Sequence, residues 1–160
     1  MAPESEGDLD AAVDAVLLAS RALVAVAARS IAVVESSADV IEVRVLVVLA
    51  SREAASLREV ADALGLHVST ASRLCDRMVA RGLLDRRDDP ADRRQLELRL
   101  TADGTRVLSR MRTERRRDVK RILARMSTPD RDRLAETFDA FSTAAGDASE
   151  RDLWAIGWPH

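Results

Sequence analysis

The sequence predicts a mainly α-helical fold with one small antiparallel β-hairpin. Apolar residues recur at helical spacing through most of the 160 residues. One segment, between residues 83 and 100, instead alternates polar and apolar side chains around a loop of turn-forming residues. Hydrophobic residues make up 47% of the chain, enough for the core of one domain, and the formal net charge is only −2. No general positive field is therefore expected.

Composition excludes several classes of protein. With one cysteine and two histidines, neither an intrachain disulfide nor a metal site is expected, and no cofactor is indicated. The acidic N-terminus has the wrong charge for a signal peptide, and no uncharged stretch approaches the ~18 apolar residues of a membrane span. Aromatic residues are only 2%, which disfavours a protein that stacks single-stranded bases. No phosphate loop or nucleophile turn occurs. We expect a cytoplasmic protein with no membrane partner that is not an enzyme.

Residues 1–7 are predicted to be a disordered lead, and residues 8–36 to form one long N-terminal helix. Its apolar residues recur at helical spacing along the whole length and include Leu9, Val13, Leu17, Val24 and Ile31. So wide an apolar stripe exceeds what one small domain covers, and a second copy of the chain is the simplest cover. We therefore expect a dimerisation helix; an ordinary core helix is the alternative.

The run from Val40 to Ala50 is rich in β-branched residues and fits either a buried strand or a helix. We expect a helix, because a third packed helix is needed to complete the core of the two helices that follow. Ser51 to Ala55 are expected to be a connection.

A helix-turn-helix is predicted between Ser56 and Gly82. Ser56 and Glu59 form a capping box for a first helix that begins at Leu57, and Gly65 ends that helix. The second helix should extend from Val68 to Arg81. Its buried stripe is expected to comprise Ala71, Leu74, Cys75 and Met78, which makes the single thiol a core residue. Hydroxyl and guanidinium side chains lie outside the stripe, and these groups suit base edges and phosphates: Ser69, Thr70, Ser72, Arg73 and Arg77.

A hairpin is predicted directly after this helix. Its strands are Leu83 to Arg87 and Gln95 to Leu100, joined by a charged tip over residues 88–94. A hairpin in this place is a wing, and Arg94 at its tip is placed to enter a minor groove of double-stranded DNA. A solvated loop in which aspartates pair with arginines is the alternative. Residues 39–100 thus form a winged helix-turn-helix domain, and the fold class is mainly α with a small antiparallel β-wing plus helical dimerisation arms.

Residues 101–145 are predicted to form two C-terminal dimerisation helices. Thr101 caps the first, which reaches about Met126 and carries a basic cluster. We expect this cluster to contact acidic residues of the partner's first helix; contact with DNA phosphates is the alternative. Thr128 is expected to cap the second, with Pro129 in its first turn. Residues 146–160 form a tail with Trp154 and Trp158, which we expect to dock on the dimer rather than fray.

The run LLDRRDDPADRRQLELRLTADG, together with the helices before it, resembles the MarR family of bacterial winged-helix regulators. The matching positions of the wing tip and following strand are Asp89, Pro90, Asp92, Arg94, Leu100, Thr101 and Gly104. The resemblance implies a homodimeric repressor bound to a pseudo-palindromic operator and released by a small-molecule effector. It places Ser69, Thr70, Ser72 and Arg73 in the major groove, Arg77 on the backbone and Arg94 in the minor groove.

His67 departs from the family, which often has serine at this helix N-cap, so the capping interaction is in question. The resemblance also places an effector pocket between the dimer base and the winged domain. Its expected wall residues in this chain are Val24, Ile31, Val43, Arg44 and Leu108. A winged-helix protein-interaction module that lacks specific DNA binding is the alternative function.

Overall fold

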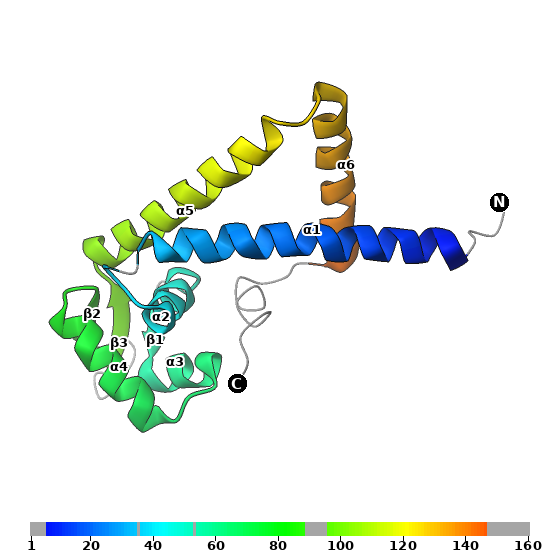
Figure 1. The fold of residues 1–160 in the computed structure, drawn as a ribbon. Coiled ribbons are helices and arrows are strands. Elements are labelled where there is room, and N and C mark those ends of the chain that lie inside the picture. Colours follow the sequence, from blue (N-terminus) through cyan, green and yellow to red (C-terminus); the bar gives the residue numbers. More distant parts are fainter. Residues whose placement is uncertain (1–5, 35, 53, 89–95, 147–160) are drawn as a thin grey trace.

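The computed structural model describes residues 6–34, 36–52, 54–88 and 96–146. Their order is α1 (Glu6–Ala32), α2 (Val40–Ala50), β1 (Ala55–Ser56), α3 (Leu57–Leu64), α4 (Val68–Ala80), β2 (Leu84–Asp88), β3 (Leu96–Leu100), α5 (Ala102–Leu123) and α6 (Thr128–Ala145). Figure 1 shows α2, α3, α4 and the sheet grouped together, with α1 and α5 extending away from them as long arms. The mainly helical class with a small antiparallel sheet is confirmed.

Local signals set both ends of α3 and the start of α5 as the sequence predicts, whereas α1 (Glu6–Ala32) ends earlier than the predicted residue 36 and α6 has a different cap. Ser56 and Glu59 form the capping box of α3, and Gly65 ends that helix in the left-handed conformation at φ 66°. Thr101 caps α5 through the Gly104 amide. For α6 the predicted cap at Thr128 is wrong. Ser127 is the N-cap and accepts from the Asp130 amide, because serine one residue earlier is an equally good cap.

The predicted hairpin is present, and it gains a third strand. β2 pairs with β3 in antiparallel register from Leu84 opposite Leu100 to Asp88 opposite Leu96. β1, which falls in and just after the predicted connection, pairs with the other edge of β3 and gives the order β1-β3-β2. The tip over residues 89–95, including Arg94, lies outside the described residues.

The core of the winged-helix body lies where α2 crosses α3, α4, the sheet and the start of α5. Leu46, Leu49 and Met78 are fully buried there. α2 is a helix, as expected, and its β-branched composition reflects burial on most sides. Gly104 is fixed by a close approach, because a Cβ at that position would overlap the Leu83 carbonyl oxygen.

The N-terminal part of α1 and the whole of α6, which belong to the helical arms, lack such a core within one chain. Leu9, Val13 and Leu17 of α1 are exposed, and α6 has no buried residue among those described. α1 also has the length and composition of a membrane-crossing helix, with mean hydropathy 1.9 over its most apolar stretch between Gly7 and Ala32, although Arg21 and Arg29 interrupt it. Interface helices of soluble proteins share these properties, so they do not by themselves identify a membrane segment. The tryptophan tail lies outside the described residues.

Candidate nucleic-acid interface

The predicted face of α4 is directed to solvent. Ser69, Thr70, Arg73 and Arg77 are exposed, and Ser72 is half-buried. The opposite side of the helix packs into the core through the predicted stripe of Ala71, Leu74, Cys75 and Met78. The structure therefore brings all five predicted α4 residues onto one outward-facing helix.

The N-terminal end of α4 has no side-chain cap. His67 occupies the N-cap position but makes no side-chain capping hydrogen bond, as its departure from serine suggested. Instead Arg73 Nε donates to the Ser69 carbonyl oxygen at 3.3 Å, within the exposed helix. The first turn of α4 thus leaves its side chains available to a ligand.

A hollow of about 320 Å³ lies between α2 and this face of α4. Three of its lining residues, Thr70, Arg73 and Arg77, are predicted DNA contacts. The other three are the apolar residues Ile41, Leu66 and Leu74. The candidate interface is therefore a shaped surface rather than a row of separate side chains.

Glu42, which sequence reasoning missed, anchors the other end of α4. Its carboxylate is fully buried and accepts from Arg77 Nε at 3.2 Å and from Arg81 Nη1 at 2.8 and 2.6 Å. Burial raises the pKa of Glu42, but hydrogen bonds from the Asp39 amide, Arg81 and Arg77 outweigh it and hold that pKa below its ordinary value. Glu42 is therefore a carboxylate at neutral pH.

A second missed tie joins α4 to the wing. Arg86 of β2 donates to Asp76 of α4, and Ser72 Oγ lies 3.4 Å from the other Asp76 oxygen. Charges also pair within the wing strands, where Arg87 bonds Asp85 and Arg99 bonds Glu97. The loop for which pairing of aspartates with arginines was the alternative lies almost wholly outside the described residues. Ion pairs thus join α4 to α2 through Arg77 and to β2 through Asp76.

Cys75 lies in the core, as its position on the buried stripe predicted. Burial raises the pKa of its thiol to about 11, and the nearby Arg86 lowers it only in part. Little thiolate is present at neutral pH, so the group is poorly suited to oxidant sensing.

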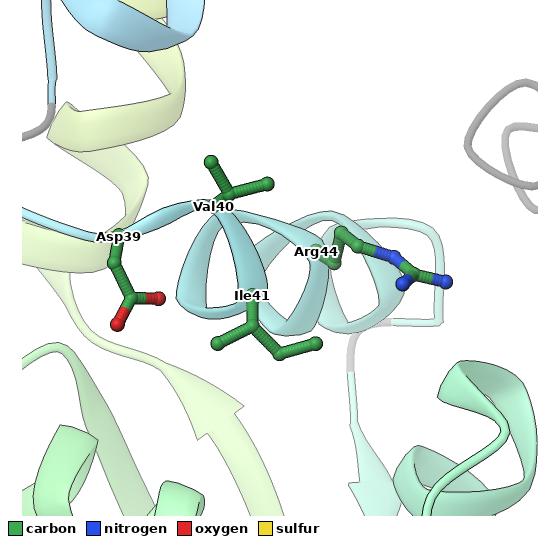
Figure 2. A pocket seen from close by; sticks show the side chains of 4 residues that line it. All are labelled: Asp39, Val40, Ile41 and Arg44. Atoms are coloured by element: carbon green, nitrogen blue, oxygen red, sulfur yellow. The ribbon is translucent and has the colours of Figure 1, made fainter. Parts of the chain in front are cut away.

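The five expected effector-pocket residues differ in burial within one chain. Ile31, Val43 and Leu108 are buried in the core, while the Val24 side chain is 59% exposed. Aliphatic residues at these positions fit a core as well as a pocket wall, which is why the sequence did not separate the two. Arg44 lines a hollow of about 360 Å³ at the start of α2, with Asp39, Val40 and Ile41 (Figure 2).

The basic cluster of α5 finds part of its acidic complement within the chain. Asp118 of α5 bonds Arg121 of the same helix and also Arg29 of α1, whose Nε lies 2.9 Å away. Arg117 of α5 bonds Glu114. The expectation that acids of a partner's first helix contact this cluster stays a prediction. The tie between Arg29 and Asp118 fixes α1 against α5 in the same chain.

Comparison with known proteins places these features in a family. A sequence profile of the MarR family matches residues 39–95. The transcriptional repressor MprA of Escherichia coli K12 is 31% identical over 93 residues, which are 57% of this chain and 53% of that protein, so the chain spans about half the length of that relative. The crystal structure of RV1404 from Mycobacterium tuberculosis is 36% identical, with a TM-score of 0.74 over 92% of this chain and 99% of that one.

A solved structure from Staphylococcus aureus contains nucleic acid. It is a mutant of MepR bound to an oligodeoxyribonucleotide, and it superposes with a TM-score of 0.65 over 84% of this chain and 97% of that one. Its sequence identity is 14%, so this likeness concerns the fold alone.

Proposed function

Because this chain belongs to the MarR family of transcriptional regulators, we propose that it is a cytoplasmic, homodimeric repressor that binds double-stranded DNA at a pseudo-palindromic operator. The observation that carries the proposal is the outward face of α4. Ser69, Thr70 and Arg73 project from a helix whose other side is fixed in a core. A helix held in this way has the dimensions and the donor groups for the major groove.

Each site residue has a distinct proposed contact. Ser69, Thr70, Ser72 and Arg73 face base edges, where an arginine fork suits guanine. Arg77 contacts a phosphate, since its guanidinium lies farther along the same face. Arg94 of the wing enters the adjacent minor groove; this residue lies outside the described part of the chain, so its role rests on the sequence.

A second copy of the chain is the proposed cover for the arms. The exposed apolar residues of α1 and the exposed Phe138 and Phe141 of α6 form surfaces that one chain leaves open. A two-fold axis would bring the same surfaces of two copies together and present two α4 helices to successive turns of a duplex.

A small molecule with an acid group is the proposed effector, and Arg44 is its proposed anchor. Arg44 Nε is buried and has no hydrogen-bond partner among the described residues, and the side chain lines the hollow in Figure 2. A buried donor without a partner is costly, and a carboxylate would satisfy it. A carboxylate that raises the melting temperature of the wild type but not of Arg44→Gln would support this assignment; equal shifts would contradict it.

Gel shifts test the function itself. The duplex is the DNA immediately upstream of the coding sequence, compared with a scrambled duplex at two salt concentrations. We expect retention of the upstream duplex with a steep salt dependence, loss of sequence preference in Arg73→Ala, and weaker binding to A·T-flanked sites in Arg94→Ala.

Arg133→Ala is the matched control, because it removes one exposed arginine from α6, away from α4. It should bind as the wild type does. Absence of retention on every duplex would refute DNA binding and favour a protein-interaction module of the same shape.

A further inference from the structure

The first turn of α2 contains a buried carboxylate that serves two elements at once. Glu42 and Asp39 form a capping box: the Glu42 amide donates to Asp39 Oδ1 at 2.9 Å, and the Asp39 amide donates to Glu42 Oε2 at 2.9 Å. Capping alone does not require burial, since the equivalent Glu59 of α3 is exposed. Glu42 differs from Glu59 in that it also accepts hydrogen bonds from Arg77 and Arg81.

Two arginines bond this carboxylate: Arg77 in the last turn of α4 and Arg81, the C-cap residue that follows the helix. Arg81 bonds both carboxylate oxygens and also donates from Nη2 to the Ser37 carbonyl oxygen at 2.6 Å. Arg77 bonds Glu42 through Nε, and its Nη2 lies 3.7 Å from Asp39 Oδ2. The two arginines therefore have different geometries: Arg81 is directed into the loop before α2, whereas Arg77 holds Glu42 by one edge.

Arg77 remains 54% exposed despite this bond. A guanidinium has five N–H donors in a rigid plane, so a bond at Nε fixes the plane while other donors stay available. A side chain whose orientation is already fixed loses less entropy when it binds a phosphate. The Glu42 carboxylate thus sets the direction in which Arg77 meets a ligand at the surface of α4.

We infer that Glu42 is a positioning residue for DNA binding, which acts by fixing the Arg77 guanidinium toward a phosphate. This inference rests on the proposed function. It assigns to a buried residue of α2 a part in an interface that the residue does not touch.

A double-mutant cycle in the full-length dimer tests the inference. Glu42→Gln keeps the shape of the side chain and removes its charge. We expect Glu42→Gln and Arg77→Ala each to weaken binding to the upstream duplex about tenfold, the scale of one charge-assisted hydrogen bond. Each should also lower the slope of log K against log salt by about 0.9, the loss of one phosphate contact. The double variant should bind no more weakly than Arg77→Ala alone.

Glu59→Gln is the matched control, because Glu59 holds the same capping-box position in α3 but bonds no arginine of α4. It should leave the salt slope unchanged. A Glu42→Gln variant with the wild-type slope, or one whose loss adds to that of Arg77→Ala, would overturn the inference and leave Glu42 a purely structural residue.

Arg77→Lys keeps the inference testable if Glu42→Gln fails to fold. Lysine keeps the charge, but its single ammonium group has no fixed plane with which to hold a carboxylate and a phosphate together. We expect it to bind as weakly as Arg77→Ala, and wild-type affinity would overturn the inference. A wild-type chain that retains no duplex would instead refute the proposed function, so the two failures are distinguishable.

Discussion

The winged-helix body and the helical arms differ in where their apolar side chains lie. In the body, α2 buries Val43, Leu46 and Leu49 against elements of the same chain. In the arms, Leu17 of α1 is 58% exposed and α6 buries none of its residues. The core of the body, which also contains Ile31 of α1 and Leu108 of α5, is buried within one chain, whereas the apolar surface of the arms stays exposed.

The charged residues of the body and of the arms also differ in burial. Glu42 in the body is enclosed and bonded on both carboxylate oxygens. Several ion pairs of the arms instead join residues three apart on an exposed helix surface, as Arg117 and Glu114 do on α5. Such surface pairs contribute little to stability, while a buried carboxylate that loses its partners is costly. Polar contacts therefore add to the apolar packing that holds α4, whereas the proposed dimer of the arms would depend on apolar area.

The largest expected effect is that of Leu17→Asp on dimerisation. Burial of one leucine contributes about 1.5–3 kcal/mol, and a two-fold interface contains the residue twice. The dimer should therefore dissociate at least ~100-fold more readily, as sedimentation velocity would measure. Val68→Asp, on exposed α4, is the control and should leave the dimer intact. A wild-type chain that is monomeric at micromolar concentration would contradict the comparison.

Leu46→Ala tests the body. Leu46 is fully buried, so its truncation should lower the free energy of unfolding by about 2–5 kcal/mol, through lost burial and a residual cavity. Urea denaturation at two protein concentrations measures this loss, which should be equal at both. The loss in Leu17→Asp should instead shrink on dilution, because the wild-type dimer then dissociates as well. A loss below about 1 kcal/mol would mean that the core is not closed within one chain.

Gly104→Ala tests the junction where the body meets the arm α5. On an open helix this change would stabilise by about 1 kcal/mol. Here the new methyl group would overlap the Leu83 carbonyl oxygen and lie 3.3 Å from Leu46 Cδ2, and such overpacking costs about 1–3 kcal/mol. We expect net destabilisation in thermal denaturation. Gly7→Ala in α1, where the methyl group meets nothing within 4 Å, should not destabilise; equal effects of the two changes would refute this account.

Local signals made much of the fold predictable from the sequence. The capping box at Ser56, the stop at Gly65 and the stripe on α4 depend on residues no more than eight positions apart, and all are confirmed. β1 was missed because two residues are too few to show alternation. The sequence resemblance included Gly104, but only the contact with Leu83 gives the physical reason for a glycine there.

Long-range contacts made the site harder to predict. Glu42 bonds arginines 35 and 39 positions away, and a glutamate at N3 is already explained by capping. For Ile31, Val43 and Leu108, an aliphatic side chain indicates burial but does not distinguish a core from a ligand pocket. Exposed polar residues of α4 were predictable because helical periodicity alone separates them from the stripe.

The smallest expected effect is a pH dependence confined to the arms. The hydrogen bond from Arg29, together with Arg121, outweighs burial and holds the pKa of Asp118 below its ordinary value. A lowered pKa means that the folded chain favours the ionised form. The ion pair therefore stabilises the fold above the ordinary carboxyl pKa, and this contribution is lost as the pH falls through the lowered pKa.

Asp118→Asn should therefore lose less stability than the wild type as the pH falls below about 4, in thermal denaturation. Asp103→Asn, which removes an exposed carboxylate paired with Arg106 on the same helix, should follow the wild-type curve. Parallel curves for the wild type and Asp118→Asn would show that α1 is held against α5 by apolar packing alone. Polar contacts would then contribute to the fold of the body and not to the packing of α1 on α5.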